Sequence, residues 1–413
     1  MRKIIAGLEV GSETLKLVVG ESYKNRINIL AVAQVPSQGV KKGFIIEPNL
    51  FLNPLKELFL KCENMLGLRV SKVVVTVPSE DVEFMMLEGK TTISKDNPVI
   101  SQQDIIHSMQ AATYNRIEKD KEIVSIKPTS YTVDNEKIDR NPIGMEGKKL
   151  VTKTLVVTIP KKNVLPIVKC LEKVGVETID YTLESIADYY QLERPMMKDV
   201  VGAIINIGYE TTTVSIFNKG LLTNTEVMHI GGKSIEKDIA YMFHLPKNAA
   251  KNVKMELAQA HSRGVSANIQ KEYTTTEDKN VLISEYEATE VATSRLEEIL
   301  KLAKKQINLL TKKEIHYIMI TGGVSEMTGF PVLVESIFGH NAKVASPKEL
   351  GVRSNIYSAA VGLIKYYDEL TKLKKEEFSI FNEEETEELS NVNRKLSFGE
   401  NSILGKLFGY FYN

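Results

Sequence analysis

The stretch Ala203–Phe217, AIINIGYETTTVSIF, predicts the fold of the whole chain because its pattern occurs twice. An apolar, β-branched run leads into Gly208, four turn residues follow, and a second β-branched run ends the stretch. This order is typical of a strand, a tight turn and a strand. The same pattern opens the chain, around Gly11. One such hairpin near the start of each half indicates two similar lobes facing each other.

The two turns suggest an anion site, because a glycine lets backbone N–H groups converge on a negative charge. A phosphate chain could lie between them. Two ordinary hairpins that bind nothing are the alternative at this point. Aligning Gly11 with Gly208 places Glu9 on Asn206, Glu13 on Glu210 and Thr14 on Thr211.

Length and composition indicate a globular protein with two to four domains. The chain has 413 residues, 43% hydrophobic and 26% charged, as in soluble proteins. Because the net charge is zero, no nucleic-acid partner is expected. Cys62 and Cys170 lie far apart, which favours a reducing cytoplasm over disulfides. We find no signal peptide, bilayer-spanning run, Walker loop or metal-spaced histidine pair.

Hydrophobic periodicity divides most of the chain into strands and amphipathic helices. Before residue 83 we expect strands at 4–10, 15–21, 29–35 and 72–77 and a helix at 53–66. After residue 160 we expect helices at 163–174, 185–191, 234–242, 248–260 and 285–310, a hairpin at 201–220 and a strand at 316–320. Residues 262–284 are polar and predicted to be irregular. Thr321-Gly322-Gly323 follows a buried strand, which suits close backbone approach to a phosphorylated ligand.

Residues 83–160 are predicted to form a separate small α+β block. We expect strands at 82–87, near 122–126 and 129–134, and at 150–159. A helix should begin at the capping box Ser101-x-x-Asp104.

The amino-acid composition changes toward the end of the chain. Residues 371–400 are rich in Glu and Lys and predict a disordered linker. A short apolar helix pattern follows, and beyond a charged linker it has no core to join. It therefore favours a membrane surface or a partner groove, with packing against the body as the alternative. Its apolar face comprises Ile403, Leu404, Leu407, Phe408 and Phe411.

Taken in order, these motifs resemble those of the FtsA family, the bacterial actin-like cell-division proteins that tether FtsZ filaments to the membrane. The resemblance extends over nearly the whole chain. The family's first phosphate loop is resembled by residues 7–12, and the signature of its subdomain 1C by residues 141–145. Its GG-to-DIA stretch is resembled by residues 231–240, its adenosine loop by residues 321–323 and its closing helix by residues 358–363. The tail resembles its membrane-targeting sequence.

The resemblance implies an α/β, actin-like fold, with duplicated ribonuclease-H-like lobes around a nucleotide cleft and an inserted small α+β subdomain, 1C. Subdomain 1A would comprise residues 1–82, 161–198 and 353–370, and 1C residues 83–160. Subdomain 2A would comprise residues 199–240 and 312–352, and 2B residues 241–311. The linker and a membrane-targeting helix at 401–413 would follow.

The resemblance also implies ATP in the cleft, with Mg²⁺ as a possible companion. No catalytic or metal-ligating residue is predicted. The expected nucleotide-binding residues are Glu9, Gly11, Ser12, Glu13, Lys16, Asn206, Gly208, Tyr209, Glu210, Thr211, Gly231, Gly232, Lys254, Gly322, Gly323 and Val324.

Several residues depart from the family pattern where chemistry would occur. Glu9 and Asn206 stand where the two loops usually carry aspartate, and an amide can neither carry charge nor act as a base. Glu210 adds a negative charge near the phosphates, and Lys251 replaces the usual acid of the ribose helix. We therefore expect ATP binding with slow or absent hydrolysis.

The partners implied by the resemblance are the FtsZ C-terminal peptide, further copies of the chain in a head-to-tail filament, the cytoplasmic face of the membrane at the division site, and other division proteins. Arg295, Lys301, Lys304 and Lys305 would receive the acidic peptide on 2B, with a solvated helix face as the alternative. Two other classes stay open: a superfamily enzyme, such as a sugar kinase or polyphosphatase, and an actin-like pilus-assembly protein. Pelleting with lipid vesicles would separate the adaptor from a metabolic kinase.

Overall fold

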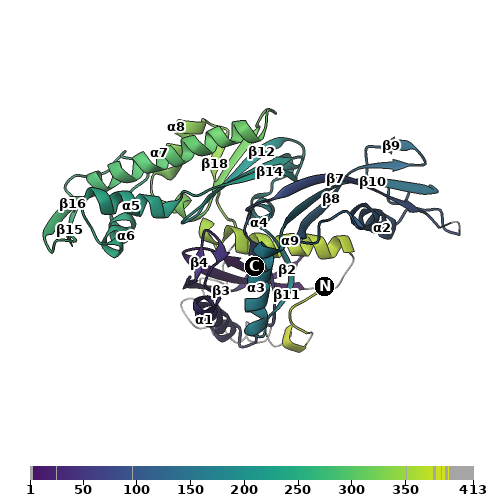
Figure 1. Ribbon diagram of the computed structural model, residues 1–413, viewed down its shortest axis with the longest axis horizontal. Coiled ribbons are helices and arrows are strands. Elements are labelled where there is room, and N and C mark those ends of the chain that lie inside the picture. Colours follow the sequence, from purple (N-terminus) through teal and green to yellow (C-terminus); the bar gives the residue numbers. More distant parts are fainter. Residues whose placement is uncertain are drawn as a thin grey trace, which may run out of the picture.

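Two lobes with the same strand order make up most of the molecule (Figure 1). The computed structural model describes residues 3–24, 26–94, 96–349, 351–374, 378–382, 384–386 and 389. The first lobe's sheet has the order β11-β6-β1-β2-β3, and the second lobe's has β14-β13-β12-β17-β18. In each, three consecutive strands form an antiparallel meander, and two later strands add in parallel beside the first. The duplication predicted from the hairpins is confirmed.

The first lobe is a sheet packed against helices. Helix α9 approaches the sheet so closely that a Cβ on Gly7 would lie 2.2 Å from the carbonyl oxygen of Ala360. Helix α4 packs against α9 where the two lobes meet. The strands are β1 (Lys3–Val10), β2 (Thr14–Tyr23), β3 (Arg26–Pro36), β4 (Val40–Lys41), β5 (Phe44–Ile45), β6 (Lys72–Val77) and β11 (Glu177–Leu183); the helices are α1 (Pro48–Leu66), α3 (Lys161–Lys173), α4 (Glu184–Leu192), α9 (Ser358–Lys374) and the 3-10 turn η1 (Pro195–Lys198).

The second lobe is longer and carries a hairpin at its far end (Figure 1). That hairpin, β15 (Gln270–Thr274) and β16 (Asn280–Ser284), corrects the prediction of irregular structure at 262–284. Polar, exposed strand residues hid it from a hydrophobicity pattern. The other strands are β12 (Val201–Ile207), β13 (Thr212–Asn218), β14 (Leu221–Met228), β17 (Tyr317–Thr321) and β18 (Ala342–Val344); the helices are α5 (Gly232–Met242), α6 (Lys247–Glu256), α7 (Glu285–Leu310), α8 (Phe330–Phe338), η2 (Gly323–Glu326) and η3 (Asn355–Tyr357).

The inserted block lies beside the first lobe and projects away from the hairpin of the second (Figure 1). Its elements are β7 (Glu83–Thr92), α2 (Gln102–Thr113), β8 (Lys121–Val133), β9 (Glu136–Ile138) and β10 (Lys149–Pro160). The predicted capping box is present at Ser101 and Asp104. The two strands expected between 122 and 134 are one, because the ladder shifts register opposite Pro128, which cannot donate a hydrogen bond, and then continues.

The inserted block is continuous with the first lobe. Val124, Leu155 and Val157 belong to the first lobe's core, whereas the block's own core is small. The block is therefore built partly on the lobe that it interrupts.

The predicted linker at 371–400 is wrong in its first part. Helix α9 continues to Lys374. Beyond it, Ile380 and Phe381 are buried in the first lobe's core, and the Ile380 N–H donates to the Ile4 carbonyl at 2.9 Å. Leu389 is buried in the same core, so three apolar residues hold this charged segment against the lobe. The predicted membrane-facing residues 403–411 lie outside the described residues.

Within the part of the chain that the structure describes, no helix combines the length and apolarity that a bilayer span requires.

Candidate functional site

A cavity of about 580 Å³ lies between the lobes, where the two hairpin turns face each other. Its walls contain all the predicted nucleotide-binding residues except Gly231. Gly231 lies behind the wall, because a Cβ there would meet the Gly208 carbonyl oxygen at 2.5 Å. The tertiary structure thus brings together predicted residues from five separate stretches of the chain: 9–16, 206–211, 232, 254 and 322–324.

The two turns are the same structure used twice. Gly11 N–H donates to the Thr14 carbonyl at 3.2 Å, and Gly208 N–H donates to the Thr211 carbonyl at 2.9 Å. The sequence alignment of the hairpins therefore corresponds to a structural one.

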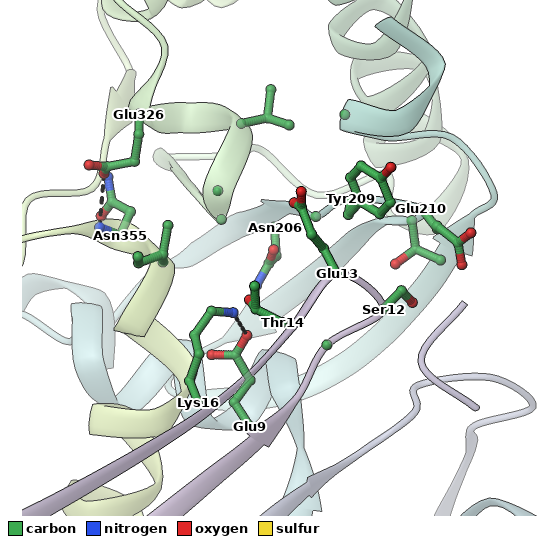
Figure 2. A pocket seen from close by; sticks show the side chains of 18 of the residues that line it. Glu9, Ser12, Glu13, Thr14, Lys16, Asn206, Tyr209, Glu210, Glu326 and Asn355 are labelled. Atoms are coloured by element: carbon green, nitrogen blue, oxygen red, sulfur yellow. Dashed lines mark hydrogen bonds and ion pairs between the residues drawn. The ribbon is translucent and has the colours of Figure 1, made fainter. Parts of the chain in front are cut away.

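The cavity floor carries a buried ion pair. Glu9 and Lys16 are directly opposite each other on β1 and β2, and their side chains form an ion pair (Figure 2). Both are more than nine-tenths buried. Lys16, one of the predicted nucleotide-binding residues, thus has its charge balanced by Glu9 of its own lobe.

Sequence reasoning missed two carboxyl groups on α4. Asn206 donates through Nδ2 to Oδ2 of Asp188 at 2.7 Å, so a carboxyl group lies one hydrogen bond behind the amide. Glu184 lines the cavity. Burial, together with the negative charge of Glu9 nearby, raises the pKa of both carboxyl groups above the ordinary values.

A sequence signal for this pair existed. Glu184 is the first residue of the helix that follows β11, and β11 is parallel to β6 and β1. Side chains that follow parallel strands gather at one sheet edge, where α/β proteins place their sites. An acid immediately after a strand was the available clue.

One part of the cavity is apolar. It is lined by residues of α6, η2, η3 and the loops beside them: Met255, Ala258, Val324, Met327 and Ile356. Glu326 accepts a hydrogen bond from the Asn355 N–H at 2.8 Å and fixes these loops together (Figure 2). The cavity therefore joins an apolar part to a glycine-rich, charged part.

Gly322 is required by the backbone itself. Its φ is +95°, and a Cβ would lie 2.5 Å from Oδ1 of Asn206 and 2.5 Å from the Ile207 carbonyl oxygen. Gly323 also lines the cavity, but a Cβ there would meet only Ile356 at 3.7 Å. Substitutions at Gly322 would disturb the fold, whereas substitutions at Gly323 would fill the cavity.

The second turn is surrounded by lysines that have acidic partners. The Nζ atoms of Lys233, Lys251 and Lys254 lie 5.7, 5.9 and 5.5 Å from the centre of the Tyr209 ring. Lys254 pairs with Glu236, which also accepts from the Tyr209 hydroxyl at 2.8 Å. These lysines are held in place but not free of counter-charge.

No three His, Cys, Asp or Glu side chains among the described residues are grouped so that they could hold a metal ion. The carboxylates that line the cavity are dispersed around it. A protein-only metal centre is therefore absent from this part of the chain.

The four basic residues predicted to bind a peptide on α7 do not share one surface role. Arg295 forms a two-point contact with Asp238, with Nη2 and Oδ1 2.9 Å apart, and also pairs with Glu298. Lys304 donates to the Ile337 carbonyl at 2.5 Å. Lys301 and Lys305 instead line a shallow groove with Ser294, Glu297, Glu298 and Leu302. Arg295→Glu would therefore place a carboxylate beside Asp238 and lower the stability of the lobe.

Solved structures similar to the chain define its class. The PilM–PilN type IV pilus biogenesis complex covers 87% of this chain and 97% of its own, with a TM-score of 0.58 and 19% identity. MreB5 of Spiroplasma citri bound to ADP covers 91% and 99%, with a TM-score of 0.56 and 13% identity. The fold is that of an actin-like protein.

Sequence comparisons give the family within that class. The family model described as "Cell division protein FtsA" matches residues 203–362, and the one described as "SHS2 domain inserted in FTSA" matches residues 80–158. The cell division protein FtsA of Bacillus subtilis (strain 168) is 29% identical over 367 residues, covering 88% of this chain and 83% of that protein. The chain belongs to the FtsA family of cell-division proteins.

Proposed function

We propose that this cell-division protein is an ATP-binding adaptor that forms filaments and joins FtsZ to the cytoplasmic membrane. The observation that carries the nucleotide part is the cavity between the lobes. Its volume of about 580 Å³ lies within the usual range for small-ligand sites. The apolar loops around Met327 and Ile356 would hold the base, and the two glycine turns would face the phosphates.

Mg²⁺ would enter with the nucleotide. Because the described residues offer no grouped metal ligands, the phosphates and water would supply most of its coordination, as is common for this ion. The dispersed carboxylates fit such an arrangement better than a resident metal centre.

Hydrolysis would be slow or absent. An attacking water needs a positioned base, and Asn206 offers a neutral amide whose Nδ2 donates to Asp188. A metabolic kinase would turn over at roughly 1–100 per second. A rate in that range would favour the enzyme alternative over the adaptor.

Titration calorimetry with ATP and Mg²⁺ tests nucleotide binding. Gly323→Asp should abolish binding while the melting temperature stays close to that of the wild type, because the added side chain points at open cavity. Gly323→Ala, which adds one methyl group, is the matched control and should bind nearly as the wild type does. Absence of binding by the wild-type chain at millimolar ATP would refute the proposal.

The adaptor part is supported by family membership and by surfaces outside the cleft. The groove on α7 holds Lys301 and Lys305 beside Glu297 and Glu298, and the two lysines would pair with the carboxylates of an acidic FtsZ peptide. Subdomain 1C projects from the first lobe (Figure 1) and would contact region 2B of a further copy, and a head-to-tail contact of that kind gives filaments. The tail helix would attach to the membrane.

A further inference from the structure

Each hairpin turn carries a glutamate at the aligned position, and ligand binding explains neither. Glu13 and Glu210 both line the cavity, although a carboxylate beside a phosphate site is unfavourable unless its charge is used elsewhere. In the structure the carboxylate of each glutamate contacts a partner in the opposite lobe.

Glu13 reaches from the first lobe to the second. Its Oε1 lies 2.7 Å from Nζ of Lys251 on α6. The Lys251 ammonium also lies over the ring of Tyr209, in the second turn, and this contact holds it beside the cleft. The pair is partly exposed, with 34% of the Glu13 side chain accessible.

Glu210 reaches from the second lobe to the first. Its Oε2 accepts the backbone N–H of Lys42, in the turn between β4 and β5, at 2.6 Å, while Oε1 pairs with Lys233 of its own lobe at 2.6 Å. The neighbouring Gly43 N–H donates to Oγ of Ser12 at 2.9 Å, which ties the Lys42 turn to the first hairpin.

The Glu210 carboxylate is held in its charged form. Burial alone would raise its pKa, but the hydrogen bonds from Lys233 and from the Lys42 N–H outweigh burial, so the pKa is lowered. The contact with the first lobe therefore persists at neutral pH.

We propose that the contacts Glu13–Lys251 and Glu210–Lys42 are two cross-cleft clasps that gate the cavity, so that nucleotide exchanges only when both are open. Each clasp joins the turn of one lobe to the other lobe, so separation of the lobes breaks both. The ion pairs Lys254–Glu236 and Lys271–Glu256 stay within the second lobe and are unaffected by opening. The inference rests on the proposed nucleotide cleft.

The first test needs no nucleotide. Hydrogen exchange of the Lys42 amide reports the second clasp directly, because Glu210 is its acceptor. Glu210→Gln should speed that exchange about tenfold, since a hydrogen bond to a charged acceptor is lost. Glu256→Gln, an ion-pair change within the second lobe, should leave it unaltered. Unchanged exchange in Glu210→Gln overturns the proposal.

The second test measures exchange of a fluorescent ATP analogue with Mg²⁺ by stopped flow. Glu13→Gln should raise both the association and the dissociation rate about threefold, as befits a partly exposed ion pair, and Glu210→Gln about tenfold. Loss of a negative charge without gating would instead slow dissociation of the anion. Lys251→Met should also speed both rates, although it removes a positive charge, and Glu256→Gln should change neither.

The two tests distinguish failure of the gating proposal from failure of the nucleotide-binding proposal. Slower or unchanged dissociation in both Glu13→Gln and Glu210→Gln overturns the gate. If the analogue does not bind the wild-type chain, the nucleotide proposal fails, and with it the gating of nucleotide. The amide exchange of Lys42 then still decides whether the Glu210 clasp exists.

Discussion

At the scale of residues, the cavity floor is a cluster of carboxyl groups with few cations. Asp188 is fully buried behind Asn206, and the Glu9–Lys16 pair lies nearby. Asn206 at the loop position thus has a carboxyl group one hydrogen bond behind it, on α4. Buried carboxyl groups resist ionisation, so this cluster links stability to pH.

The first prediction concerns Asp188→Asn. Because the folded pKa of Asp188 is raised, the folded state holds its proton more tightly than the unfolded state does. The free energy of unfolding should therefore fall as pH rises from about 4 through that raised pKa. The variant cannot titrate there, so it should lose less stability, by about 1.4 kcal/mol per pH unit within this range.

Urea unfolding at pH 5, 6, 7 and 8 measures the difference. Glu277→Gln, an exposed change in the β15–β16 turn, is the control and should follow the wild type. If Asp188→Asn runs parallel to the wild type at every pH, the carboxyl group at 188 does not behave as described.

At the scale of elements, the basic residues of α7 fall into two groups, those that contact the rest of the lobe and those that line the groove. Arg295 and Lys304 contact other helices of the lobe, whereas Lys301 pairs with Glu297 of its own helix and is 64% exposed in its side chain. Residues three and four apart share a helix face, which is why Lys301 and Lys305 line the same groove.

The second prediction uses this division. Lys301→Ala with Lys305→Ala should weaken binding of the FtsZ C-terminal peptide about tenfold, because two favourable charges are lost from the groove. Lys304→Ala, on the same helix but directed at the Ile337 carbonyl, is the matched control and should bind the peptide normally. Fluorescence anisotropy with labelled peptide gives the affinities, and equal affinities for all variants would place the site elsewhere.

The third prediction concerns the inserted subdomain. Tyr114, at the end of α2, is 76% exposed, so Tyr114→Glu should leave the fold intact and disrupt a contact between copies. Met65→Glu, an equally apolar-to-acidic change at an exposed site on α1, should not. Electron microscopy on lipid monolayers should show filaments for Met65→Glu and few for Tyr114→Glu. Normal filaments from both would exclude this end of α2 from the contact.

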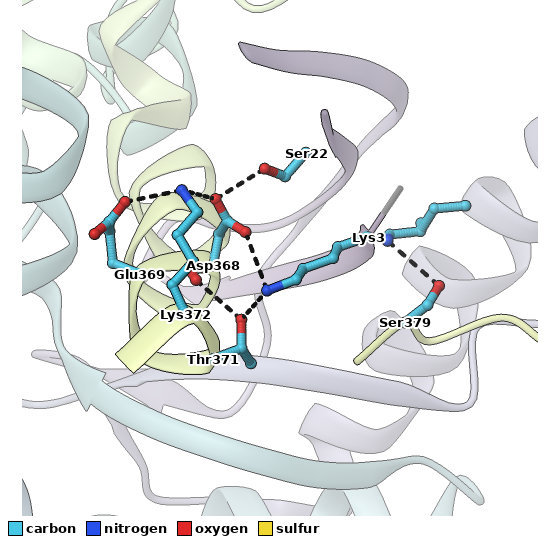
Figure 3. Close-up of polar contacts among 8 residues, drawn as sticks. Lys3, Ser22, Asp368, Glu369, Thr371, Lys372 and Ser379 are labelled. Carbon is cyan, nitrogen blue, oxygen red and sulfur yellow. Dashed lines mark hydrogen bonds and ion pairs between the residues drawn. The ribbon is translucent and has the colours of Figure 1, made fainter. Parts of the chain in front are cut away.

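At the scale of the whole molecule, the C-terminal stretch is tied to the first strand. Figure 3 shows Lys3 between Asp368 and Thr371 of α9, with Ser379 accepting from a backbone N–H beside it. Ile380, Phe381 and Leu389 are buried in the first lobe's core, so the described C-terminal residues pack on this lobe.

The fourth prediction concerns the tail. Five large apolar residues could each contribute roughly 1.5–3 kcal/mol if fully buried, but ordering about ten residues costs roughly 1–2 kcal/mol each. One tail should bind weakly, and a filament with many tails should bind well. Leu407→Glu with Phe408→Glu should release the protein from vesicles in co-sedimentation, with an unchanged melting temperature.

The coupling to assembly has its own control. Tyr114→Glu keeps the tail intact but should bind vesicles less well than the wild type, because single tails remain. Equal sedimentation of this variant and the wild type, when only the wild type forms filaments, would separate membrane binding from assembly.

The sequence by itself determined the features that depend on local order. The duplicated hairpins, the capping box at Ser101, helix α7 and the residues that gather at the cleft followed from periodicity, glycine placement and family motifs. These signals are local because backbone geometry and side-chain alternation repeat over a few residues.

Only the tertiary structure decided how charges pair. The polar contacts of the cleft and of α7 join residues that are 18 to 238 positions apart or in different lobes. They are Asp188 with Asn206, Arg295 with Asp238, and the contacts of Glu13 and Glu210 across the cleft. The hairpin at 270–284 and the return of Ile380 to the core also depend on surfaces supplied by distant segments. A charge has no period along the chain, so its partner is fixed only when the lobes fold and meet.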